Sequence, residues 1–160
     1  MDGRGFTLLL LLSVVVAGCL SYATRIQVSP SNSGGARLSN AEIKQVTAVV
    51  GGVATRFGFH SNPSLAELRR TSEESKEYDQ RVVADYLADR DSKTHGRLIL
   101  TVGVHKETGQ VTVLIRDLDS FRSTEFTSSL EEEITKALGA RYSPHAIKVE
   151  RGAVGPDLGP

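Results

Sequence analysis

Two aliphatic segments joined by a short turn constrain the fold of this chain more than any other feature. Residues 97–105 and 110–117 alternate between apolar and polar positions, which is typical of strands with one buried face. The four residues between them end in Gly109, and hairpin turns of this kind often place glycine where the backbone needs a positive φ. The sequence therefore predicts a β-hairpin.

The turn fixes which side chains share a face of the hairpin. With His105 opposite Gln110, one face of the hairpin carries only aliphatic side chains. A shift of one strand by one residue would mix aliphatic and polar side chains on both faces. We expect this face to form the core, through Leu98, Leu100, Val102, Val104, Val111, Val113 and Ile115. The other face mixes two large aliphatic side chains with polar ones and is a candidate interaction surface, made of Ile99, Thr101, His105, Thr112, Leu114 and Arg116.

The segment before the hairpin contains the pattern of a long amphipathic helix. Ser39 begins a capping box, and apolar residues then recur at spacings of three and four as far as Phe57. Gly58 follows as a C-terminal stop. Gly51 and Gly52 in the middle of this helix cost about 1 kcal/mol each relative to alanine, and we attribute them to close packing against a neighbouring backbone rather than to a hinge.

Two more helices are expected. One covers residues 62–75, where an asparagine cap precedes a proline in the first turn. The other is capped by Ser123 or Thr124, carries an apolar stripe and ends at Gly139.

Two further strands complete the expected sheet. Residues 80–88 suit either a strand or a helix, and we favour a strand because an isolated hairpin needs a neighbour. Residues 146–150 follow a proline and form a last short strand. The expected fold class is α+β: an antiparallel sheet of three to four strands, a meander plus a C-terminal strand, with two or three helices packed on one face.

The N-terminal region carries a targeting signal. Arg4 precedes an apolar run from Phe6 to Val16, which is shorter than the ~20 residues of a membrane-spanning helix and is typical of a secretory signal. The run ends in a branched aliphatic residue, two small residues and Cys19. This motif resembles the lipobox of bacterial lipoproteins. The alternatives are an ordinary signal with a chance cysteine, or a short buried helix.

The resemblance to bacterial lipoproteins implies both an anchor and a location. Cys19, the single cysteine of the sequence, would receive a diacylglyceryl group with acyl chains such as palmitate after cleavage just before it. Leu20 follows in place of the aspartate that retains lipoproteins in the inner membrane. In a Gram-negative source this implies the outer membrane, with the domain facing the periplasm.

The expected organisation has a single folded domain. A Ser- and Gly-rich stretch after the signal has too little apolar surface to offset its ordering entropy, although Ile26 and Val28 could pair with a sheet edge. The four parts are a signal peptide (1–18), a flexible tether (19–37), an α+β domain (38–151) and a disordered tail (152–160).

Composition and motifs exclude several functions. The 19 basic and 19 acidic residues include no basic block, and tryptophan is absent, so nucleic-acid binding is not expected. The four histidines do not stand at metal-ligand spacings, and no phosphate loop or nucleophile elbow occurs. Asp117 and Asp119 could hold calcium weakly, but turn formation explains them more simply. We therefore assign no catalytic residue, metal or cofactor.

Two main functions remain open. The favoured one is a non-catalytic envelope lipoprotein that is anchored in the membrane and binds another envelope protein or assists an assembly. The alternative is a small periplasmic enzyme acting on cell-wall or lipid material, with a site formed by His105, Arg116 and Asp117. A ligand-binding sensor module is a weaker third possibility.

Overall fold

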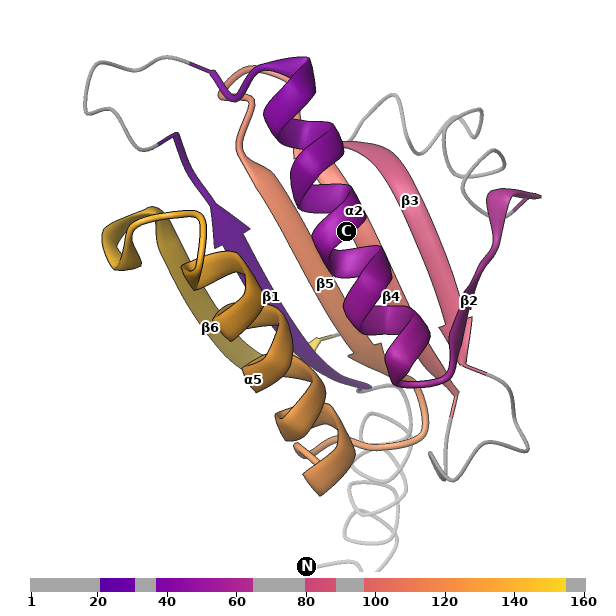
Figure 1. Cartoon of the computed structure of the whole chain (residues 1–160). Helices are drawn as coiled ribbons and strands as arrows, with labels where there is room; N and C mark the ends of the chain where they lie inside the picture. The colour runs from indigo at the N-terminus through magenta and orange to yellow at the C-terminus, as the bar shows by residue number, and fades with distance from the viewer. Residues whose placement is uncertain (1–20, 31–36, 65–79, 89–96, 155–160) are drawn as a thin grey trace, which may run out of the picture.

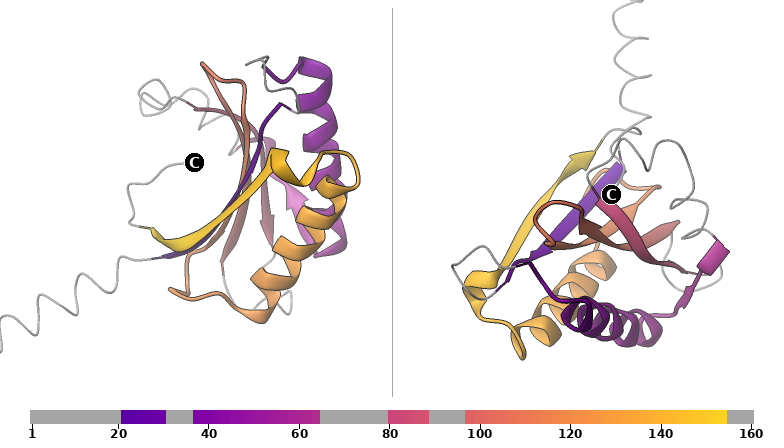
Figure 2. Two further views of the ribbon diagram at one scale, coloured as in Figure 1. Left: turned by 90° about the vertical axis from the view of Figure 1, so that its left-hand side faces the viewer. Right: turned by 90° about the horizontal axis from the view of Figure 1, so that it is seen from above.

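A computed structural model describes residues 21–30, 37–64, 80–88 and 97–154. In this part of the chain, two helices cover one face of a single sheet (Figures 1 and 2). The strands are β1 (Ser21–Val28), β2 (Phe59–Ser61), β3 (Gln80–Ala88), β4 (Leu98–His105), β5 (Val111–Asp117) and β6 (Ile147–Val154). The helices are α2 (Asn40–Arg56) and α5 (Glu125–Gly139), and a 3-10 turn spans Pro144–Ala146.

The six strands form one antiparallel sheet in the order β2-β3-β4-β5-β1-β6. The α+β class is therefore confirmed, whereas the expected count of three to four strands is too small. The strand predicted over residues 80–88 is confirmed as β3.

The hairpin has the predicted register. Ile99 lies opposite Arg116, and the His105 amide donates to the Gln110 carbonyl at 2.8 Å. Gly109 has a φ of 64°, and a Cβ added there would lie 2.7 Å from the Cβ of Arg37. Both the backbone conformation and the lack of space therefore require glycine at this position.

The prediction of a flexible tether is wrong for residues 21–28, which form β1. This strand lies between β5 and β6, and its Ile26 and Val28 are completely buried. The alternation of β1 places these side chains in the core, so burial offsets the entropy of ordering them. The Ser- and Gly-rich composition that suggested a tether begins only after Val28.

The last strand is longer than predicted. It extends to Val154 because its whole length pairs with β1, from Val28 opposite Ile147 to Ser21 opposite Val154. Residues 152–154 therefore belong to the sheet and not to the expected tail. The signal peptide, Cys19, residues 155–160 and most of the helix expected over 62–75 lie outside the described residues.

Helix α2 begins and packs as its sequence predicts. The Ser39 amide donates to the Glu42 carboxylate at 2.7 Å, and the Glu42 amide donates to the Ser39 hydroxyl at 3.2 Å, which completes the capping box. The first of these hydrogen bonds is the main reason why the pKa of Glu42 lies below its usual value. A Cβ on Gly51 would lie 2.7 Å from the Tyr86 hydroxyl, so close packing explains this glycine, against a side chain rather than a backbone. A Cβ on Gly52 would have no atom within 4 Å, so the prediction of close packing is wrong at that position.

Helix α5 is capped by Thr124 and ends at Gly139, as expected. A polar cluster joins it to the sheet: Arg151 of β6 donates two hydrogen bonds to Glu131, one of them 2.8 Å long from Nε to Oε2. Thr24 of β1 donates to the same carboxylate at 3.3 Å. The nearly buried Glu131 carboxylate is thus bonded to the buried Thr24 and to the exposed Arg151, which joins α5 to β1 and β6.

Candidate functional site

The six residues predicted as an interaction surface lie together on the outer sheet face, the face turned away from the helices. However, Thr101 and Thr112 are each only 1% exposed and Leu114 is 5% exposed, so these residues are not at the surface. The other three residues (Ile99, His105 and Arg116) are half-buried.

Strands β4 and β5 are central strands with neighbours on both sides. Asp85 of β3 accepts a hydrogen bond from the Thr101 hydroxyl, and Ser21 of β1 accepts one from Arg116 at 3.2 Å. Side chains of both flanking strands therefore occupy the same face. A surface formed by the hairpin alone does not describe this fold.

The alternative catalytic site is not assembled. Arg116 lies opposite Ile99 at one end of β4, whereas His105 lies at the other end. At about 3.4 Å per residue, the backbones of these two positions are roughly 20 Å apart. Asp117 follows Arg116 directly in β5, so its side chain points to the opposite face, and it accepts the Asp119 amide at 3.0 Å in the turn.

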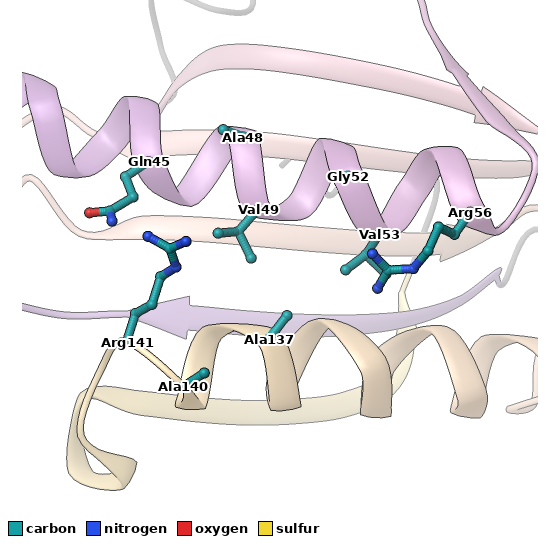
Figure 3. A pocket seen from close by; sticks show the side chains of 9 residues that line it. All are labelled: Gln45, Ala48, Val49, Gly52, Val53, Arg56, Ala137, Ala140 and Arg141. Carbon is teal, nitrogen blue, oxygen red and sulfur yellow. The ribbon is translucent and has the colours of Figure 1, made fainter.

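An open groove lies between α2 and α5 on the helical side of the molecule (Figure 3). Its volume is about 500 Å³, which is within the range of ligand-binding clefts. We call it the α2–α5 groove; it is lined by Gln45, Ala48, Val49, Gly52, Val53, Arg56, Ala137, Ala140 and Arg141.

Alanine, valine and glycine residues make the apolar part of the α2–α5 groove. On the α2 side Val49 and Val53 point toward α5, where Ala137 lies opposite them, whereas Ala48 lies on the side of α2 away from α5 (Figure 3). A Cβ added to Gly52 would have no atom within 4 Å, so open space lies in front of this backbone. The groove therefore lets another backbone approach both helices closely.

The groove residues of α2 form a second stripe beside the core stripe. They recur at helical spacings of three and four from Gln45 to Arg56, as the core residues do. A search for large apolar side chains does not reveal this stripe, because it consists mainly of small and polar ones. Nothing in the local sequence placed α5 and Arg141 beside it.

Guanidinium groups flank the groove at two places. Arg141 extends toward Gln45 at one end, and Arg56 lies at the other (Figure 3). Arg56 is 3.6 Å from Glu133 of α5, and both side chains are largely exposed, so this ion pair is weak. In the part of the chain that the structure describes, Arg141 has no ion pair.

The chemistry of the groove suits binding. Its lining offers apolar surface, one amide side chain and two guanidinium groups. None of these nine lining residues is a nucleophile, a carboxylate or an imidazole, the groups from which acid–base and covalent catalysis are built.

The remaining observations concern metals, membranes and relatives. Among the described residues, no group of three or more His, Cys, Asp or Glu side chains could hold a metal ion. No helix in the described ranges is long and apolar enough to cross a membrane. Comparison with known proteins gives no match to a protein family, a curated sequence or a solved structure.

Proposed function

We propose that this chain is a lipid-anchored binding domain of a bacterial envelope, which holds an acidic amphipathic helix of another envelope protein in the α2–α5 groove. The observation that carries the proposal is the groove itself: an apolar lining of alanine, valine and glycine residues flanked by Arg56 and Arg141. It favours an adaptor over the periplasmic enzyme, whose candidate residues lie at opposite ends or on opposite faces of the sheet.

The shape of the groove favours a helix as the occupant. Its α2 side runs from Gln45 to Arg56, which is about 17 Å of helix at ~1.5 Å per residue. Ridges of a third helix pack well between two others when small residues allow the axes to come within roughly 8–10 Å. Recognition of an amphipathic helix in a groove commonly uses anchors at intervals of three and four residues.

The charges of the groove favour acidic anchors. A carboxylate can accept two parallel hydrogen bonds from a guanidinium group, and such pairs add specificity as well as attraction. Because the cations are separated along α2, the partner helix would carry acidic residues about two to three turns apart. Between them it would present small or apolar side chains to Val49 and Ala137.

The lipid anchor supplies the location. The lipobox ending at Cys19 supports attachment to the membrane, and two or more acyl chains make release negligible because each buried methylene contributes about 0.8 kcal/mol. Leu20 supports the outer membrane, facing the periplasm, in a Gram-negative source. The partner would then be another protein of the same compartment.

Site-specific photo-cross-linking in cells tests the groove. A photoreactive amino acid at Ala140, in the full chain, should give one defined product whose cross-linked peptide belongs to an acidic amphipathic helix. The same amino acid at Glu132 is the matched control, because Glu132 is exposed on α5 but does not line the groove. Arg141→Glu should lower the yield at Ala140 at least tenfold, whereas Lys44→Glu, on the exposed part of α2 outside the groove, should not.

Two results would contradict the helix-binding proposal. One is equal cross-linking from Ala140 and Glu132, which would show nonspecific contact. The other is equal sensitivity to Arg141→Glu and Lys44→Glu, which would show a general charge effect.

Metabolic labelling with palmitate tests the anchor separately. Wild-type protein should incorporate label and fractionate with membranes, whereas Cys19→Ala should remain unlabelled and either unprocessed or soluble. Normal labelling of the Cys19→Ala variant would exclude lipidation at this cysteine.

A further inference from the structure

Phe121 is the one large hydrophobic side chain that is strongly exposed in the described residues, at 61% of its maximum. It lies in the loop between β5 and α5, residues 118–124, which we call the Phe121 loop. The guanidinium carbon of Arg122 lies 5.2 Å from the centre of its ring, a cation–π arrangement. A single exposed aromatic residue is common on protein surfaces, so its position in the fold must decide whether it has a role.

The loop holds its tip in a defined conformation. The Ser120 carbonyl accepts the Tyr22 amide of β1 at 2.6 Å. The Ser120 hydroxyl donates to the Arg122 carbonyl at 2.8 Å and accepts the Arg122 amide at 3.1 Å. These bonds lie on both sides of Phe121 in the chain, so the exposed position of the ring is built into the loop.

A second set of contacts neutralises the acidic residue of the loop. The Asp119 carboxylate accepts the Arg97 amide at 2.8 Å and its Nε and Nη2 at 3.1 and 3.0 Å. Arg122 forms no ion pair with any described residue. The tip therefore combines an exposed aromatic ring with a guanidinium group that can reach an external anion.

The tip lies next to the proposed lipid anchor. Tyr22, which is hydrogen-bonded to the loop, stands only three residues after Cys19. Even a fully extended chain would place the Cα atoms of Cys19 and Tyr22 no more than about 11 Å apart. In Figure 1 the start of β1, the end of β5 and the start of α5 lie at the same, lower end of the sheet, and Tyr22 pairs with Asp117 there.

We propose that the Phe121 loop contacts the membrane surface, with the Phe121 ring inserted at the level of the headgroups and Arg122 bound to a lipid phosphate. The inference rests on the proposed lipid anchor. Because β1 leaves almost no spacer after Cys19, an acylated chain brings this end of the sheet to the bilayer. Phenylalanine is among the side chains that membrane-surface proteins bury at the boundary of headgroups and acyl chains, and arginine can keep its charge in the headgroup region while its stem packs on apolar surface.

This contact would set the orientation of the whole domain. The β4–β5 turn lies at the opposite end of the sheet, so it would point away from the bilayer. The lipid anchor and the Phe121 loop together give two attachment points, which restrict tilting in a way that one anchor cannot. The α2–α5 groove would then stand beside the membrane in a fixed orientation.

A tryptophan at position 121 tests the contact, because the chain has no other tryptophan. The full chain carrying Phe121→Trp is purified from bacterial membranes and reconstituted into vesicles of phosphatidylethanolamine and phosphatidylglycerol. We expect its emission maximum to lie at shorter wavelength than that of a tryptophan in water, and its intensity to fall in vesicles with brominated acyl chains. Glu107→Trp, at the exposed β4–β5 turn, should show neither effect.

Flotation of the same samples separates failure of the inference from failure of the anchor. If both proteins float with the vesicles but the Phe121→Trp variant emits like the Glu107→Trp variant, the membrane contact is wrong and the anchor stands. If the protein carries no acyl group and does not float, both are wrong. A second reporter, Arg122→Trp, should behave like Phe121→Trp. If brominated lipids quench neither tryptophan, the proposed membrane contact is wrong, even if one of the two variants folds poorly.

Discussion

Strands β4 and β5 have buried side chains on both faces of the sheet, but the two faces differ in chemistry. On the helical side, Leu100, Val102 and Val113 are completely buried among aliphatic neighbours. On the outer sheet face, Thr101 and Thr112 are just as inaccessible, although their side chains are polar. The comparison shows that alternation along a strand identifies its two faces, while the neighbouring strands help to decide whether the polar face is exposed.

The largest expected effect comes from a charge placed on either face of β4. Alternation alone would make Thr101→Asp mild and Val102→Asp severe. In the structure Thr101 is buried and donates to Asp85, so Thr101→Asp would bury a second carboxylate beside the first. We expect both variants to lose several kcal/mol of unfolding free energy, measured by urea denaturation of the purified protein. A loss of less than about 1 kcal/mol for Thr101→Asp would show that the outer face is open in solution.

A smaller effect separates two aliphatic residues of the outer sheet face. Leu114 is 5% exposed, so Leu114→Ala should cost about 2–4 kcal/mol through lost burial and a residual cavity. Ile99 is half-buried, and Ile99→Ala should cost roughly 1 kcal/mol. Denaturation midpoints of the two variants, at equal slopes, measure the difference. Equal small losses of unfolding free energy in both variants would show that this face is exposed, as the sequence predicted.

Local signals explain what the sequence predicted correctly. The hairpin register depends on a turn and its adjoining strands, and Gly109 has the positive φ that the turn needs. The capping box of α2 requires only Ser39 and Glu42, three residues apart. In each case the residues that determine the structure are close together in the chain.

Pairing between distant segments explains what was missed. Ile26 lies opposite Val113 of β5 and Val149 of β6, although these partners are far away in the sequence. The alternation of Ile26 and Val28 is compatible with a strand, but only these distant partners decide whether the segment pairs or remains a tether. The α2–α5 groove has the same origin, because Ala48 and Ala140 become neighbours of one cavity only after both helices pack on the sheet.

The smallest effect compares the two sides of α2, one facing the sheet and one facing the groove. Gly51 and Gly52 are adjacent and have similar helix propensities, so alanine at either position should stabilise an isolated helix by about 0.5–1 kcal/mol. A Cβ at position 52 would meet no atom within 4 Å, whereas one at position 51 would lie 2.7 Å from the Tyr86 hydroxyl.

We therefore expect Gly52→Ala to raise the melting temperature by a few degrees. Gly51→Ala should give no gain, because the half-buried Tyr86 ring must move to admit the new methyl group. Calorimetry of the two single variants and of Gly51→Ala combined with Tyr86→Phe separates the helix propensity of alanine from its steric clash with the Tyr86 hydroxyl. Removal of the hydroxyl should recover part of the stabilisation that Gly51→Ala lacks. If Gly51→Ala and Gly52→Ala raise the melting temperature equally, α2 does not contact β3 closely at Tyr86, and the tight packing inferred for the helical face is wrong.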